Sequence, residues 1–150
     1  MSEILREIGV ISRALSFISN IEFKELHLNK GQYLYMARIC EHPGIINDTL
    51  AELLKKDRTT VAKSVSKLEK DGLIRKEIDP ANKKIRCLYP TAKGQELYCQ
   101  LEREEKYSEA QALAGLSAQE REQLQQLLKK VRQNVEQDWS LVKNGGKRQY

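Results

Sequence analysis

The sequence of 150 residues is poor in cysteine, proline, glycine and aromatic residues, and it has no long apolar run. Its three cysteines are odd in number and form no CxxC pair, which excludes a disulfide scaffold and fits a reducing compartment. The few prolines and glycines exclude a collagen-like chain, and the sparse aromatics argue against a stacking platform for single-stranded nucleic acid. No segment approaches the ~18 apolar residues of a membrane span, and no secretory signal is visible. We therefore predict a cytoplasmic protein with no membrane partner.

The motifs of common enzymes are also missing. Glycines are isolated except at Gly145-Gly146, so there is no phosphate-binding loop or dinucleotide fingerprint. There is no GxSxG nucleophile elbow and no HExxH metal motif. Cys40 and His42 could supply two metal ligands, but ordinary packing is the favoured interpretation because the remaining histidine and cysteines are distant. We predict no enzyme activity, no metal site and no cofactor.

Positive charge is concentrated in the middle of the chain. The formal net charge is +5. The segment from Lys55 to Lys93 holds twelve Lys or Arg and five Asp or Glu, a local charge of +7, so the rest of the chain carries −2. Such a segment is typical of a surface that binds a polyanion, although by itself a solvated basic face explains the charge equally well.

Apolar residues recur at intervals of three and four near both ends of the chain, which predicts amphipathic helices. The first helix covers about residues 2–19, with a stripe close to a coiled-coil seam. A long helix begins around 91–94, and another begins at a capping box of Ser117 and Glu120 and ends at 144–146. The two terminal stripes consist of Ile4, Ile8, Ile11, Leu15 and Ile18, and of Leu124, Leu128, Val131 and Val135.

Three further helices are predicted in the central part of the chain. The first covers about residues 33–40. The second is short and begins with Asn47 or Asp48 as its cap, and the third covers 58–70 with Asp57 as its cap. The inner face of the short helix comprises Leu50, Ala51, Leu53 and Leu54.

The period then changes to that of β-strands. Residues 73–78 and 85–89 are predicted as two short strands, joined by a turn-rich tip at 79–84. The short helix, a polar turn and the helix over 58–70 form a helix-turn-helix, and a β-hairpin beside it is a wing. The expected fold class is therefore mostly α with a small β-hairpin wing (α+β).

The helix over 58–70 divides into an apolar and a polar side. At 100° per residue, Val61, Val65 and Leu68 gather on the side that packs against the short helix. The other side carries hydroxyl and ammonium groups, which reach phosphate oxygens and base edges. A cationic wing tip can enter the adjacent minor groove. The ordered combination with the local charge favours DNA binding.

These segments resemble the MarR family of bacterial transcription regulators, and its SlyA-like branch most closely. The resemblance covers essentially the whole chain. Its strongest stretches are Leu50-Ala51-Glu52-Leu53, Asp57-Arg58-Thr59-Thr60-Val61, Leu68 to Ile74, the Asp79-Pro80 wing and Thr91-Ala92-Lys93-Gly94.

The resemblance implies a winged-helix homodimer whose terminal helices are interwoven, and a recognition helix in the major groove. On this basis the chain is one MarR-type domain over 1–150, with dimerisation helices in 1–30 and 95–143 and a winged helix-turn-helix in 31–94 (helix-turn-helix 47–71, wing 73–90). The candidate DNA contacts are Arg58, Thr59, Thr60, Lys63, Ser64, Lys67, Lys70, Arg75, Lys83, Lys84 and Arg86.

One position departs from the family pattern. The family wing usually has an acidic residue followed by arginines, whereas the matching positions here are Asn82, Lys83 and Lys84. Lysine lacks the planar fork of arginine, so a weaker or less selective minor-groove contact is expected.

Family members often release DNA when a small aromatic acid or phenolic ligand binds, and some sense oxidants through a cysteine. The resemblance makes Arg13 and Tyr33 candidate ligand contacts, although a core tyrosine and a solvated arginine are the simpler interpretation. A structural role is favoured for all three cysteines. The sequence thus predicts a homodimeric, sequence-specific regulator that binds a pseudo-palindromic operator in double-stranded DNA. Two alternatives stay open: a ligand- or redox-sensing dimer that acts through a protein partner, and a structural helical-dimer adaptor.

Overall fold

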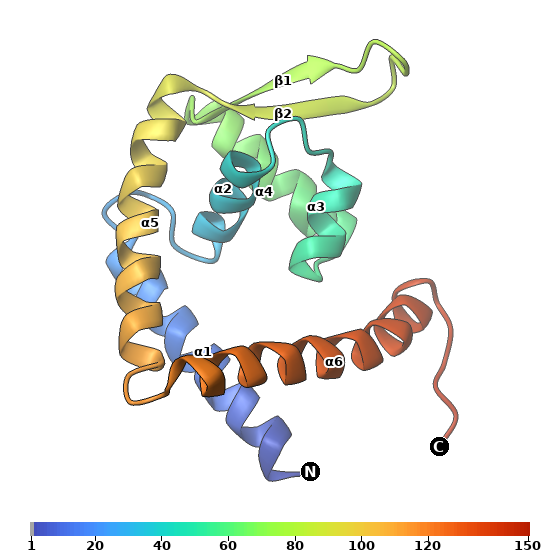
Figure 1. Cartoon of the computed structure of the whole chain (residues 1–150). Helices are drawn as coiled ribbons and strands as arrows, with labels where there is room; N and C mark the ends of the chain where they lie inside the picture. The colour runs from blue at the N-terminus through green and yellow to red at the C-terminus, as the bar shows by residue number, and fades with distance from the viewer. Residues whose placement is uncertain (1) are drawn as a thin grey trace. The chain divides into compact units, whose positions relative to one another are not determined.

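The computed structural model describes residues 2–150, which form six α-helices and one antiparallel β-hairpin (Figure 1). This confirms the predicted fold class. The chain divides into two compact units, one extending to Ser108 and the other comprising Glu109–Tyr150. The elements are, in order, α1 (Glu3–Glu22), α2 (Gln32–Glu41), α3 (Asn47–Leu54), α4 (Arg58–Lys70), β1 (Ile74–Ile78), β2 (Arg86–Pro90), α5 (Ala92–Ala112) and α6 (Ala118–Lys143).

Most of the core lies among α2, α3, α4 and the hairpin. Leu50 and Ala51 of α3 meet the apolar side of α4, and all of these side chains are fully buried. Met36 of α2 and Leu88 of β2 close the same core. The predicted inward position of Leu53 is wrong, because its side chain is 49% exposed. The buried side of α3 is centred between Leu50 and Ala51, and at 100° per residue Leu53 points about 110° away from that centre.

The predicted helix boundaries hold to within a few residues. The first helix continues to Glu22 rather than ending at residue 19. The Asn20 side chain accepts a hydrogen bond from the Gly31 N–H (2.9 Å), which closes the connection between α1 and α2. The cap of α3 was also predicted wrongly. Ile46 occupies the cap position and no side chain caps the helix, so neither Asn47 nor Asp48 has that role.

The first strand begins one residue later than predicted, and the second strand both begins and ends one residue later. β1 begins at Ile74 and β2 ends at Pro90, and these two residues are paired in the register. An isolated bridge joins Leu88 to Ile45, just before α3. The hairpin extends past the helices to its tip (Figure 1). Because this bridge and the contacts of α2, α3 and α4 hold its base, the exposed end is a defined projection from a packed body.

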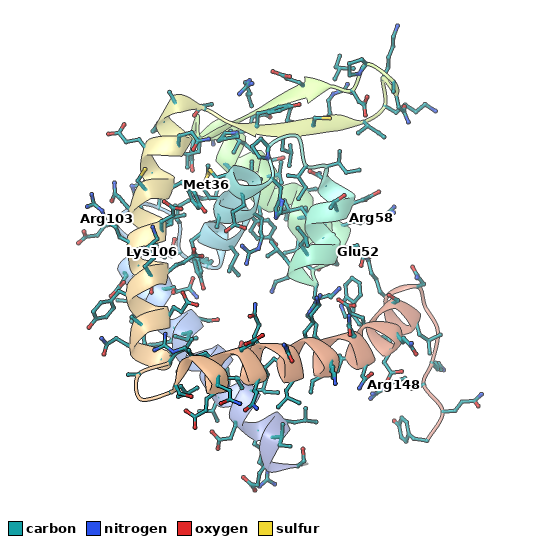
Figure 2. The ribbon with its side chains drawn as sticks, in the orientation of Figure 1. Met36, Glu52, Arg58, Arg103, Lys106 and Arg148 are labelled. Atoms are coloured by element: carbon teal, nitrogen blue, oxygen red, sulfur yellow. The ribbon has the colours of Figure 1, made fainter. Side chains whose placement is uncertain are left out.

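The start of α5 is fastened closely to the winged helix. The Thr91 hydroxyl donates to the Gly72 carbonyl (2.7 Å) and the Thr91 N–H donates to the Leu73 carbonyl (3.0 Å). Gly94 is buried, and a Cβ there would lie 2.1 Å from the Leu73 oxygen and 2.8 Å from Met36 Cε. Met36 lies on α2 beside this part of α5 (Figure 2). The backbones therefore approach more closely than any side chain at position 94 allows.

The terminal helices expose their apolar stripes. On α1, Ile4 is 67% and Ile11 is 52% exposed. On α6, which begins at the predicted Ser117–Glu120 capping box, no residue is buried. None of the helices within residues 2–150 combines the length and the apolar character needed to cross a lipid bilayer.

Candidate nucleic-acid interface

The first turn of α4 is held by its cap. The Asp57 carboxylate accepts hydrogen bonds from the Thr60 N–H (2.8 Å) and from the Thr60 hydroxyl (2.6 Å). These bonds, that from the hydroxyl foremost, lower the pKa of Asp57 below its ordinary value. The charged cap also complements the positive end of the helix dipole. The first turn is thus fixed, and one of the predicted contacts, Thr60, already uses its hydroxyl proton within the protein.

The structure separates the predicted helix residues by burial. Arg58, Thr59, Thr60, Lys63 and Lys70 are exposed. Ser64 is only 7% exposed and lies on the buried side with the valines of α4. A residue three positions after Val61 and one before Val65 falls on the packed side of the helix, and this burial argues against the predicted contact of Ser64 with DNA, which stays a prediction.

Four predicted lysines have ammonium groups that no protein group engages. Lys63 and Lys70 on α4, and Lys83 and Lys84 at the wing tip, are exposed and form no side-chain hydrogen bond or ion pair with any of residues 2–150. Lys56, in the turn before α4, has the same character. Lys56 belongs to the basic segment but is not among the DNA contacts predicted from the sequence. Its position directly before the cap of α4 is the feature that could have identified it. Within residues 2–150, each of these five ammonium groups therefore leaves its positive charge uncompensated.

The other predicted cations already have partners. Arg58, at the outer edge of the α3–α4 pair (Figure 2), lies 3.4 Å from the Asp48 carboxylate. Lys67 donates to the His27 carbonyl (2.8 Å) and to Asp71 (3.0 Å). The spacing of four residues allows the pair with Asp71, but the sequence gives no indication of the bond to His27, which lies 40 residues away along the chain.

Two arginines organise the wing. Arg75 donates to Glu77 (3.0 Å) and to the Pro90 carbonyl (3.0 Å), and its guanidinium lies 4.8 Å from the Tyr89 ring centroid. Arg86 donates to the Lys83 carbonyl (2.7 Å). Arg75 thus fixes the base of the hairpin, whereas Arg86 fixes its tip.

The wing tip is folded by short side chains. The Asp79 carboxylate accepts a bond from the Ala81 N–H (2.8 Å), and the Asn82 amide oxygen accepts one from the Lys84 N–H (3.1 Å). Both are Asx-type turns, in which a side-chain oxygen replaces a backbone acceptor. Asn82, at the position where the family has an acid, thus serves to shape the tip that presents Lys83 and Lys84.

The structure gives no shared site to the two residues expected to bind a ligand. Tyr33 is buried, with its ring 5.3 Å from that of Phe23. Arg13 is exposed and folds over Gly9, and it lies ten residues before Phe23, about 15 Å along the helix axis. A role in ligand binding stays a prediction for both.

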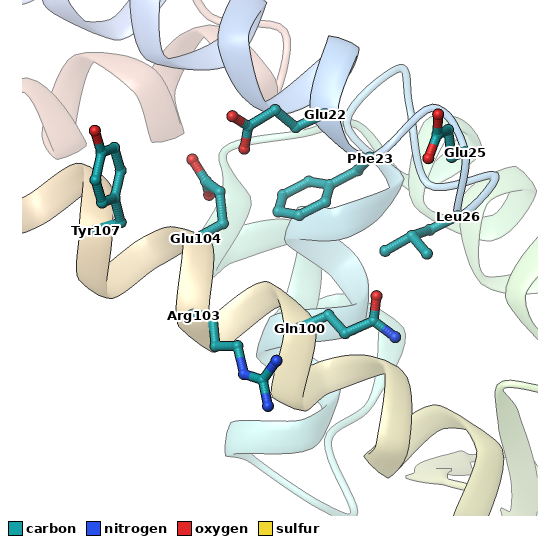
Figure 3. Close-up of a pocket in the computed structure, with 8 residues that line it drawn as sticks. All are labelled: Glu22, Phe23, Glu25, Leu26, Gln100, Arg103, Glu104 and Tyr107. Carbon is teal, nitrogen blue, oxygen red and sulfur yellow. The ribbon is translucent and has the colours of Figure 1, made fainter.

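A pocket of about 390 Å³ lies between the end of α1 and α5, and it contains neither of those two residues (Figure 3). Its charged groups are the carboxylates of Glu22, Glu25 and Glu104 and one guanidinium, that of Arg103. The Glu104 carboxylate is held by the Ser108 hydroxyl (2.6 Å). An excess of carboxylates disfavours an anionic aromatic acid in this pocket.

The cysteines are free, and two of them, Cys40 and Cys87, are half-buried. Burial, with a contribution from Glu41, raises the pKa of the Cys40 thiol to about 12. Because the thiolate is the reactive form, Cys40 is a poor redox sensor at neutral pH.

The comparisons with known proteins agree with this geometry. A sequence model of the MarR family matches residues 28–85. The HTH-type transcriptional regulator YybA of Bacillus subtilis (strain 168) is 54% identical over 150 residues, with both chains covered completely. A MarR family transcriptional regulator from Listeria monocytogenes, crystallised with a 26-mer DNA, is 53% identical, covers both chains completely and superposes with a TM-score of 0.96. A SlyA-like transcription regulator from the same species is also 53% identical over both complete chains, with a TM-score of 0.92. The chain therefore belongs to the MarR family of transcriptional regulators and has close structural neighbours among SlyA-like proteins.

Proposed function

We propose that this protein is a cytoplasmic homodimeric regulator, not an enzyme, that binds a pseudo-palindromic operator in double-stranded DNA. The observation that carries the proposal is the set of four unpartnered lysines on two adjacent elements, Lys63 and Lys70 on α4 and Lys83 and Lys84 at the wing tip. Uncompensated ammonium groups on a helix and a projecting hairpin are suited to bind the phosphates of a duplex. The Listeria relative that was crystallised with DNA supports the same assignment.

The two elements have different roles in this proposal. α4 occupies the major groove, where Thr59 and Lys63 near its N-terminal end reach base edges. The wing tip places Lys83 and Lys84 against the minor groove or its phosphates, and these contacts add affinity with little sequence preference. Arg75 and Arg86 hold the wing in shape, and Arg58 reaches DNA only if it leaves Asp48.

Dimerisation supplies the second recognition helix. The stripe on α1 exposes isoleucines that a soluble monomer would hide, and an apolar helix face of this kind is typical of a protein interface. A two-fold dimer would place its recognition helices in half-sites ~34–36 Å apart. The proposed dimerisation helices lie in 1–30 and 95–143, and the proposed winged helix in 31–94.

A binding titration tests the proposal directly. The protein is first used to select sites from random duplex DNA, and fluorescence anisotropy then compares a selected site with a scrambled duplex at several salt concentrations. We expect a palindromic selected site, tighter binding to it than to the scrambled duplex, and a steep salt dependence. Absence of binding to any duplex at low salt would refute the proposal and favour action through a protein partner.

The lysines are tested in the same assay. Replacing Lys83 and Lys84 together should reduce the salt slope by about 2 units for each subunit bound, because each phosphate contact contributes about 0.9. Lys63→Ala should weaken binding and relax the preference at one base position. Equal losses on selected and scrambled DNA would assign Lys63 to phosphate alone.

Release by a small aromatic acid or phenol is retained as a proposal from the family. Salicylate added to the preformed complex should lower the anisotropy if it holds, and Arg13→Ala should then remove the response. The carboxylate-rich pocket beside α5 is not the expected site for that anion.

A further inference from the structure

The C-terminal end of α4 is held by two ammonium groups from the protein itself. Lys67 Nζ lies 2.8 Å from the His27 carbonyl oxygen and 3.0 Å from Asp71 Oδ2. Lys93 Nζ, from the start of α5, lies 3.0 Å from the Asp71 carbonyl oxygen. The last turn of the helix is therefore joined both to the connection between α1 and α2 and to α5.

The connection that receives Lys67 has an unusual backbone. His27 has a φ of 57°, in the left-handed region that residues other than glycine seldom occupy. Its N–H donates to the Lys24 carbonyl (3.0 Å), and the next residue, Leu28, is fully buried in the core. The carbonyl that accepts the Lys67 bond is thus fixed by a tight turn and by the side chain that follows it. Residues held in such conformations persist where the surrounding structure determines them.

From these contacts we infer that Lys67 is a positioning residue for the recognition helix and not a DNA contact. The inference rests on the proposed function, since it concerns how α4 is presented to DNA. Two of the three ammonium donors of Lys67 are used, and its charge is compensated by Asp71. Lys63, one turn earlier on the same helix, is exposed and unpartnered. The two lysines look equivalent in sequence, but only Lys63 has charge available to replace counterions on a phosphate.

The bonds of Lys67 have a geometric consequence. The connection around His27 follows directly from α1, the helix whose apolar stripe is proposed to form the dimer. A tie between this connection and the end of α4 fixes the recognition helix relative to α1. In a two-fold dimer that relation sets the separation of the two recognition helices, and hence the half-site spacing that the dimer prefers. Lys67 thus contributes to the selection of DNA through spacing.

The test compares Lys67→Met with its matched control Lys63→Met, which makes the same chemical change one turn away. Anisotropy titrations against the selected operator at several salt concentrations give the affinity and the salt slope. For Lys63→Met we expect the slope to fall by about 1 unit per subunit. For Lys67→Met we expect roughly tenfold weaker binding with an unchanged slope, and a reduced preference for the selected half-site spacing over spacings changed by one base pair.

A variant with the net charge of the wild type distinguishes loss of the ion pair from loss of positive charge. Lys67→Met combined with Asp71→Asn deletes the ion pair without changing the net charge. We expect this variant to bind as weakly as Lys67→Met, again with the wild-type slope. A slope reduced as much as in Lys63→Met, or an affinity equal to that of the wild type, would overturn the inference.

Hydrogen exchange on the free protein separates this inference from the proposed function. In Lys67→Met the amides of Asp71, Gly72 and Leu28 should exchange faster than in the wild type, whereas Lys63→Met should leave them unchanged. Unchanged exchange in Lys67→Met would show that the bonds of Lys67 do not stabilise the end of α4. If the wild-type protein bound no DNA, the proposed function would fail while the exchange result still decided whether Lys67 fastens the helix.

Discussion

The winged-helix segment buries its own apolar residues, whereas α1 and α6 expose theirs. Leu68 on α4 is fully buried, but Ile11 on α1 is 52% exposed although it belongs to an equally regular stripe. In the first case α2, α3 and the hairpin pack around the stripe, whereas the Ile11 side chain stays exposed within residues 2–150. The winged-helix segment is therefore stabilised within the chain, whereas in the proposed dimer a second chain covers the stripe of α1. Substitutions in the two regions should therefore change different observables.

The largest expected effect is on the stability of the winged helix. Leu68→Ala removes a side chain that is fully buried between α4 and its neighbours. We expect the free energy of unfolding to fall by about 2–5 kcal/mol, measured by urea denaturation, because a cavity remains where the methyl groups packed. The control is Leu53→Ala on the exposed side of α3, which should change it by less than ~0.5 kcal/mol. Equal losses from the two would contradict the assigned core.

The next effect concerns association and not folding. Ile11→Asp places a charge in the exposed stripe of α1 and should raise the dimer dissociation constant at least ~30-fold, or about 2 kcal/mol. Analytical ultracentrifugation over a range of protein concentrations measures the change. Arg13→Asp, two residues along and on the opposite side of the helix, is the control. A dimer that tolerates Ile11→Asp would remove the stripe from the interface.

The two regions also differ in how closely other atoms approach their glycines. Gly94→Ala puts a Cβ 2.1 Å from the Leu73 carbonyl oxygen, so the start of α5 must shift. We expect a loss of about 1–3 kcal/mol in urea denaturation. At Gly9 on α1 the nearest atom to an added Cβ is Arg13 Nη1, at the end of a flexible side chain (3.0 Å). Gly9→Ala should therefore be neutral or stabilise α1 by up to ~1 kcal/mol. Similar losses at both positions would show that the close contact at 94 is not what fixes α5.

The smallest effect is the pH dependence of the α4 cap. Because the pKa of Asp57 is lowered in the folded protein, its stabilising contribution is present above its ordinary value of 3.8 and is lost as the pH falls through the lower folded pKa. Asp57→Ala should lower the Tm at neutral pH, and this difference should disappear in acid.

Asp57→Asn keeps an acceptor oxygen and serves as the control. It should retain most of the neutral-pH Tm without the acid dependence. A Tm difference between the wild type and Asp57→Ala that persists at low pH would mean that the carboxylate charge is not the stabilising feature.

Much of the fold could be predicted because its signals are local. The capping box at Ser117 and Glu120, the cap at Asp57 and the helical periods of α1, α4 and α6 depend on residues within one or two turns. The errors arose at residues that are compatible with two interpretations. Leucine is compatible with either side of α3, and Asn47 and Asp48 are good capping residues at a helix start where the backbone uses neither side chain.

The sequence predicts that the candidate interface is positively charged, but it does not predict which of its cations bond to other groups of the protein. Composition located the excess of cations between Lys55 and Lys93, and helical spacing placed Lys63 and Lys67 on one side of α4. It could not reveal that Lys67 meets His27, or that Arg86 closes the wing tip onto Lys83. Lys67 and His27 are 40 residues apart, so only folding brings them together, whereas the bond between Arg86 and Lys83 depends on the particular turn that the wing tip adopts.

Periodicity, capping and charge are properties of neighbouring residues, so the amino-acid sequence alone predicts where the helices lie, which of their sides are apolar and where the positive charge is concentrated. The folded arrangement of the elements, in contrast, sets which apolar side is covered and which cation is already neutralised. Both depend on the groups that folding brings within a few ångströms, and an ammonium or a leucine acquires its role from those neighbours.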